Sequence, residues 1–178
     1  MTVQEIPLNK NPLTKQNWKF GFKKTPNIRY FLQTVNLPGV FAGYVDVPGP
    51  VGRKKIPLVG NGSLAYNNFT MSFIVDEDME NYLEILEWIK GNNAPDNFEQ
   101  RMLIEQKPSG QGVYSDGVLI VSNSMHIPKV EFLFQDMFPV TLSGLEFTTV
   151  DSDKTHVTAT AEFRFMGYSA RRMQSAAT

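Results

Sequence analysis

The sequence predicts a mainly β (α+β) fold: an antiparallel β-sandwich or barrel with one flanking α-helix. Many short segments are rich in aromatic and β-branched residues and are separated by turn signals, which is the pattern of consecutive β-strands. Only one segment has the spacing of a long amphipathic helix. With 178 residues, 42% of them hydrophobic and 20% charged, the chain is able to bury a single core. We therefore expect one β domain with arms at its ends.

The first 26 residues are interpreted as a basic N-terminal arm. They contain five lysines and a single acid, Glu5, and Pro7 and Pro12 interrupt any regular element early. Aromatic residues then occupy every second position from Trp18 to Phe22. This period of two predicts that the arm ends in a short edge strand with one aromatic face.

The main domain is expected to span residues 27–168 and to begin with two strands. Residues 28–36 and 40–47 are rich in strand-forming side chains, and Leu37-Pro38-Gly39 separates them with a turn. Prolines and glycines follow from residue 48 onward. We interpret residues 44–62 as an extended loop, and a connection of that length in a compact domain usually has a function.

Residues 76–90 form the clearest predicted helix. Asp76 is placed to cap its N-terminus, and Gly91 to end it. Several apolar side chains recur at the spacing of one helical face. The residues expected on this buried face are Met79, Tyr82, Leu83, Leu86 and Ile89.

Strand-like segments make up most of the remaining chain. An extended run precedes the helix, and five further strands are expected after it, the last two forming a long hairpin. In chain order these segments are residues 64–75, 101–106, 117–126, 129–135, 140–150 and 155–167. Residues 169–178 are expected to be a flexible tail. So many strands with one helix to cover them leave unpaired edges, which pairing with neighbouring copies in a closed ring would remove.

The sequence does not predict a catalytic, metal or cofactor site. The chain has no cysteine, and its two histidines, His126 and His156, are expected in separate strands without a second ligand nearby. A triad of Asp151, Ser152 and His156 is a weaker interpretation, because Asp and Ser are common in turns. The acids from Asp76 onward are explained by a helix N-terminus. The chain is therefore not expected to be an enzyme.

Composition and termini also limit the classes of partner. The formal net charge is −1, so no overall attraction to nucleic acid or anionic membranes is expected. The first residues lack a secretory signal, and no apolar run is long enough to span a bilayer, which predicts synthesis in the cytoplasm.

One basic cluster in the loop is a candidate contact site. Arg53, Lys54 and Lys55 follow one another, and they could meet acids on the helix of a neighbouring copy. The acids that we place at this subunit interface are Glu80, Glu84 and Glu87. Contact with phosphates is an alternative, and a solvated loop is another. The chain offers no recognition helix or stacking platform for nucleic acid, which favours the contact between subunits.

Several segments, taken in order, resemble one family, the tail tube proteins of T-even-type contractile bacteriophages. Within that family the chain looks most similar to the tail completion, or tail tube terminator, proteins. The resemblance covers roughly residues 27–165 and rests on the series rather than on one motif. The segments that carry it are Leu37-Pro38-Gly39, Gly49–Arg53, Phe69–Glu77 with the helix containing Glu87-Trp88, Gly117–Ile120 and Asp151-Ser152-Asp153.

This resemblance implies a hexameric ring in which strands of all copies form one continuous β-barrel around a lumen. Residues 44–62 would reach toward an adjacent subunit or ring. A terminator ring would cap the tail tube and contact sheath terminator or neck proteins, while DNA passes through the lumen without being read. By strand alternation alone, Thr160 and Glu162 are candidates to face the lumen. The protein would be assembled in the host cytoplasm and reside in the tail of the virion.

Other functions stay open at this point. Within the same family, the chain could be the tube protein that stacks along the whole tail, or the initiator ring near the baseplate. Outside the family, it could be a monomeric β-sandwich that binds a small ligand or peptide. A hydrolase that uses His156 is the remaining alternative.

Overall fold

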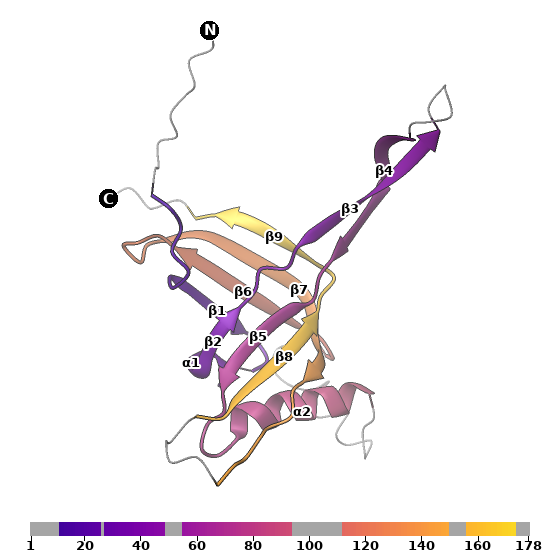
Figure 1. Cartoon of the computed structure of the whole chain (residues 1–178). Helices are drawn as coiled ribbons and strands as arrows, with labels where there is room; N and C mark the ends of the chain where they lie inside the picture. The colour runs from indigo at the N-terminus through magenta and orange to yellow at the C-terminus, as the bar shows by residue number, and fades with distance from the viewer. Residues whose placement is uncertain (1–10, 26, 49–54, 94–111, 150–155, 174–178) are drawn as a thin grey trace.

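A computed structural model describes residues 11–25, 27–48, 55–93, 112–149 and 156–173. It confirms a mainly β chain with antiparallel sheets and one long helix (Figure 1). In chain order the elements are β1 (Trp18–Phe22), α1 (Ile28–Phe31), β2 (Leu32–Val35), β3 (Val40–Pro48), β4 (Lys55–Tyr66), β5 (Phe69–Ile74), α2 (Glu80–Asn93), β6 (Ser115–Ser122), β7 (Pro128–Leu142), β8 (Thr158–Arg164) and β9 (Gly167–Arg172).

The long strand β7 connects two antiparallel sheets. The strands follow the order β1-β6-β7-β8-β5-β2, and β9 pairs with β7 as well. Residues 130–135 of β7 lie between β6 and β9, whereas residues 138–142 pair with β8. Between these two parts the register shifts, and Asp136 has a φ of 52°. Such a bulge bends a strand, which allows β7 to pass from one sheet to the other.

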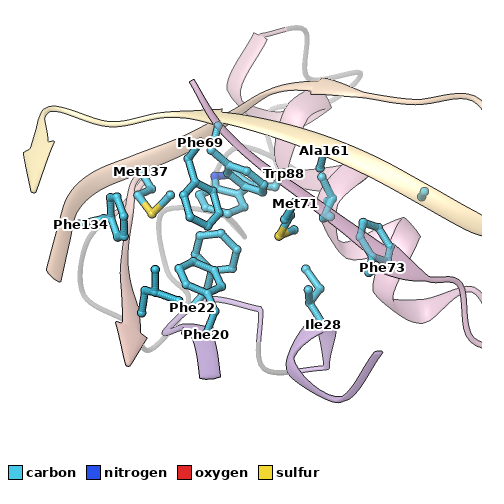
Figure 2. Close-up of a cluster of buried hydrophobic side chains, with 14 residues drawn as sticks. Phe20, Phe22, Ile28, Phe69, Met71, Phe73, Trp88, Phe134, Met137 and Ala161 are labelled. Atoms are coloured by element: carbon cyan, nitrogen blue, oxygen red, sulfur yellow. The ribbon is translucent and has the colours of Figure 1, made fainter. Parts of the chain in front are cut away.

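Aromatic side chains from both sheets fill the core (Figure 2). Phe20 of β1 stacks at 4.7 Å, between ring centroids, on Phe69 of β5. Phe163 of β8 is fully buried beside Phe22 and Trp88, the latter from α2. The cluster therefore joins the two sheets and the helix in one core.

The predicted N-terminal arm is partly wrong, because its aromatic strand belongs to the folded domain. β1 pairs along its length with β6, from Trp18 opposite Val121 to Phe22 opposite Gly117. Phe20 and Phe22 are buried. The strand lies at a sheet edge as predicted, but the folded domain begins before residue 27.

The strand predicted over residues 28–36 begins with a helical turn instead. α1 turns Ile28 into the core, where it is 1% exposed, while Tyr30 points to solvent. Just before this turn, the Asn27 amide donates a hydrogen bond to Glu84 of α2 at 2.9 Å. The need to bury one side chain and expose the next two overrides the strand propensity of this segment.

The helix exists, but its start and its buried face differ from the prediction. α2 begins at Glu80 rather than near Asp76, after Met79 with a φ of 57°. Asn81, Ile85 and Trp88 are buried, whereas Leu83 is 44% exposed. Tyr82 and Ile89 of the predicted face do pack against the core, but the prediction used apolar spacing alone and did not include Asn81. Gly91 is buried within the last turn instead of ending the helix.

Asn81 holds the start of α2 against the end of β5. The Asn81 side-chain nitrogen Nδ2 donates a hydrogen bond to the Ile74 carbonyl at 2.8 Å. Its side-chain oxygen Oδ1 accepts one from the backbone N–H of Asp76 at 3.4 Å. We expect Asn81→Ala to lower the free energy of unfolding by about 1–3 kcal/mol, because these buried groups would lose their partner. Urea denaturation measures this change. Asn93→Ala, at an exposed position, is the control, and an equal loss in both variants would contradict the assignment.

The C-terminal part differs from the prediction in both directions, and the strand predicted over residues 140–150 is wrong after Leu142. β7 runs without a break through the gap expected between residues 135 and 140, and residues 143–149 are irregular. The predicted hairpin is confirmed where β7 and β8 pair, from Phe138 opposite Arg164 to Leu142 opposite Ala161. Residues 169–172, predicted to be part of a flexible tail, belong to β9. The Tyr168 ring anchors this strand against Phe134.

Three of the expected features fall on residues that the structure does not describe. The strand over residues 101–106, the loop residues 49–54 and the turn at residues 151–153 lie outside the described residues. Residues 64–75 form two strands, the end of β4 and all of β5, separated by Asn67 and Asn68.

Candidate functional site

The segment predicted as a loop over residues 44–62 is largely a hairpin that projects from the body (Figure 1). β3 and β4 pair with each other and form a separate two-stranded sheet. Every residue of β3 is exposed. Two strands without a core are only marginally stable in water. The hairpin therefore has the character of an arm that gains stability when another surface covers it.

The outer half of the hairpin has one purely aliphatic face. Val45 lies opposite Leu58, and Val47 lies opposite Ile56, so the four side chains share one side of the two strands. We call these four residues the aliphatic face; each is between 38% and 51% exposed. Covering them would stabilise a contact by roughly 1 kcal/mol per side chain.

The opposite side of the same hairpin is mixed in character. Tyr44 pairs with Val59 and Asp46 pairs with Pro57 on that side. This division into two faces was not predicted, because the prolines and glycines of the segment indicated an irregular loop. The alternation of apolar residues at Val45, Val47, Ile56 and Leu58 was the signal that could have revealed it.

A second candidate surface is the outer face of β2, β5 and β8. Side chains on the inner face of β5 and β8 are buried, so those between them point away from the core. Hydroxyl groups dominate this outer side: Thr160 lies opposite Ser72, which is hydrogen bonded to Thr34 at 2.5 Å. We call it the polar face; its members are Thr34, Thr70, Ser72, Ile74, Thr158, Thr160, Glu162 and Arg164.

The two residues predicted to face a lumen both lie on the polar face. Thr160 is exposed. Glu162 is half-buried and accepts a hydrogen bond from the Asn68 amide at 3.0 Å. Their position away from the core agrees with strand alternation, and their contact with a lumen stays a prediction.

Within the described residues, the sheet that carries the polar face has unpaired edges at both ends. β2 pairs with β5 on one side, and no described strand pairs with its other side. At the opposite end, residues 138–142 of β7 pair with β8, while the pairing with β6 stops at Met137. Backbone donors and acceptors along two edges of one sheet are available for a further strand on each side.

Lys55, the described member of the predicted basic cluster, lies far from the predicted acidic contact residues of the same copy (Figure 1). Lys55 is at the outer end of the hairpin, whereas α2 lies at the opposite end of the molecule (Figure 1). Glu80 and Glu87 are exposed on α2, but Glu84 is engaged with Asn27. Arg53 and Lys54 lie outside the described residues. Any pairing between these two groups of charges would have to join different copies.

No catalytic constellation emerges among the described residues. His126 lies in the turn between β6 and β7 with a φ of 59°, not in a strand, and His156 is exposed before β8. Within the described ranges, no three His, Asp or Glu side chains are grouped to hold a metal ion. Asp151 and Ser152 lie outside those ranges. The helices that the structure describes are too short or too polar to cross a membrane.

Known structures share this fold at low sequence identity. A chain in the tube-terminating cap of the anti-feeding prophage matches with a TM-score of 0.66 and 12% identity over 97% of this chain and 100% of that one. A chain in the extended PVC sheath–tube complex matches with a TM-score of 0.63 and 11% identity over 92% and 94%. A chain in the anti-feeding prophage baseplate gives 0.61 and 11% over 92% and 97%. No protein-family model and no curated protein matches the chain.

Proposed function

We propose that this chain, which has the fold of chains found in contractile injection systems, is a structural subunit that assembles with copies of itself into a ring of a tail tube. The observation that carries the proposal is the sheet β7-β8-β5-β2, which has a polar outer face and an unpaired edge at each end. The similarity in fold to cap, tube and baseplate chains supports it.

The two free edges explain how a ring would close. If β2 of one copy pairs with residues 138–142 of the next, each contact uses two different surfaces of the same chain. Such head-to-tail contacts form a ring when the rotation between copies closes. The result is a continuous barrel without edges, which is hexameric in the family that the sequence resembles.

The polar face is suited to line the hole of that barrel. Its hydroxyl groups offer hydrogen bonds to water, and Glu162 is its one carboxylate. Thr160 and Glu162 would then face the lumen. A surface of this kind allows DNA to pass without a basic patch to hold it.

Charged groups at opposite ends of the molecule would add to the contacts between copies. The basic cluster of Arg53, Lys54 and Lys55 would approach the α2 acids of a neighbour, chiefly the exposed Glu80 and Glu87. Exposed ion pairs contribute about 0–1 kcal/mol each, so they orient the contact rather than drive it.

Within the tube we assign the chain to the terminator ring, which caps the tube and contacts sheath terminator or neck proteins in the virion tail. The match to a chain in a tube-terminating cap over the full length of that chain supports this assignment. The main tube protein is the second candidate, because a chain in a sheath–tube complex has a similar TM-score. As a structural subunit, the protein would have no enzymatic activity and need no cofactor.

Electron microscopy of the purified full-length protein separates these roles. A terminator is expected to form single rings and to bind only one end of tubes isolated from the same particle. A tube protein is expected to polymerise into long tubes by itself or on an initiator. A protein that stays monomeric both alone and with tubes would overturn the proposed function.

A further inference from the structure

An apolar groove of about 600 Å³ lies over the start of β7 and the end of β6. The segment of residues 11–14 forms one wall, and Leu37, just before the hairpin, forms part of another. Its apolar lining comes mainly from the two strands and the turn between them. We call it the β6–β7 groove; its apolar lining includes Leu37, Leu119, Val121, Met125, Val130 and Phe132.

The chemistry of the groove suits aliphatic side chains. Met125 is 72% exposed and Leu37 is 47% exposed, so apolar surface is open to water at its rim. The polar group nearest the turn, the side-chain oxygen of Asn123, already accepts hydrogen bonds from the amides of Met125 and Ile127. Lys129 is the one charged side chain in the lining. An occupant would thus be held by apolar contact.

The same chain has an apolar protrusion of matching character. The aliphatic face of the hairpin consists of Val45, Val47, Ile56 and Leu58, which stay 38–51% exposed among the described residues of their own copy. One open apolar surface projects and the other is concave. Each surface groups several apolar side chains, whereas the exposed apolar residues of most protein surfaces are scattered singly.

A copy cannot fill its own groove with this face. The root of its hairpin is fixed to the body next to Leu37, because the Tyr168 hydroxyl of β9 donates a hydrogen bond to the Pro38 carbonyl at 3.3 Å. Val45 lies seven residues beyond Pro38, which is about 23 Å of extended strand. The hairpin also points away from the body (Figure 1).

We propose that the β6–β7 groove receives the aliphatic hairpin face of a second copy. This inference rests on the proposed function, because it requires copies to assemble head to tail. It identifies the two surfaces that meet in each contact, in addition to the sheet edges. It also explains why a hairpin with so little support of its own carries four aliphatic side chains on one side.

Disulfide trapping tests this contact directly, because the natural chain has no cysteine. The test variant combines Leu58→Cys on the aliphatic face with Met125→Cys at the groove, both at exposed positions. Oxidation of assembled protein should link one copy to the next and give a ladder of covalent oligomers. A ladder that stops at a fixed size indicates contact within a ring, and one without an upper limit indicates contact between stacked rings.

The matched control moves the first cysteine to the other side of the hairpin. Val59→Cys with Met125→Cys uses the adjacent residue, whose side chain points away from the aliphatic face. A disulfide requires Cβ atoms that face each other, so the control should cross-link roughly ten-fold more slowly. Equal rates in the two variants, or no cross-links in either, would overturn the proposal.

Charge exchange provides a second test. Its results distinguish a failure of the hairpin–groove contact from a failure of the proposed function. Met125→Glu and Leu58→Lys should each lower the assembled fraction, by roughly ten-fold, and their combination should restore most of it. If rings form as before in both single variants, the groove has another occupant, such as a small apolar ligand, and this inference fails while the proposed function stands. If the parent protein forms no rings either alone or with tubes, the proposed function itself fails.

Discussion

Phe163→Ala is expected to lower the free energy of unfolding by about 3–5 kcal/mol, because it leaves a cavity where both sheets and the helix meet. The Phe163 ring is fully buried. Its centroid lies 4.8 Å from that of Phe22, 5.9 Å from that of Trp88 and 6.4 Å from that of Phe69. A loss of this size is a large part of the stability of an ordinary domain.

Urea denaturation followed by tryptophan fluorescence measures this loss, since Trp88 is next to the cavity. Phe147→Ala is the matched control, because that phenylalanine is 72% exposed in the irregular segment after β7. It should change the free energy of unfolding by no more than about 0.5 kcal/mol. Similar losses in both variants would contradict the core described here.

The second large effect is expected on assembly rather than on folding. Val45→Asp combined with Leu58→Asp places two carboxylates on the aliphatic face, at positions that lie opposite each other. Burying such charges in an apolar contact costs several kcal/mol, so assembly should weaken by at least about 100-fold. The core is far from the hairpin, and the thermal unfolding temperature should stay the same.

Tyr44→Asp combined with Val59→Asp is the control for this variant. These residues form the neighbouring cross-strand pair on the other side of the same hairpin, and both are highly exposed. Sedimentation velocity reports the assembled fraction of each variant. Equal assembly of the two variants would show that the aliphatic face has no specific role in the contact, and loss of folding in the first would contradict its separation from the core.

The fold class was predictable from the sequence because the strand periods are clear. Alternation from Trp18 to Phe22 and from Thr158 to Arg164 matches the burial of these strands. The long helix was also found from its periodicity. Its buried face was predicted in part: Tyr82 and Ile89 pack against the core, but Asn81 was missed, because its polar groups are satisfied at the end of β5, which no hydrophobic pattern reveals.

Features that depend on tertiary contacts were missed. β9 resembles a frayed end in sequence, but it is held by Tyr168 and by pairing with β7. The helical turn at Ile28 forms because the Ile28 side chain packs into the core, a contact with residues distant in sequence. Residues 44–62 were predicted to be a loop that reaches an adjacent subunit or ring, whereas the aliphatic face and the β6–β7 groove follow only from strand pairing and from side chains distant in sequence.

Cryo-electron microscopy of the assembled protein tests the ring most directly. We predict a closed ring in which β2 of each copy is hydrogen bonded to residues 138–142 of β7 in the next, with Thr160 and Glu162 facing the hole. A map in which those two edges remain unpaired between copies, or in which the polar face lies on the outside, would contradict the account.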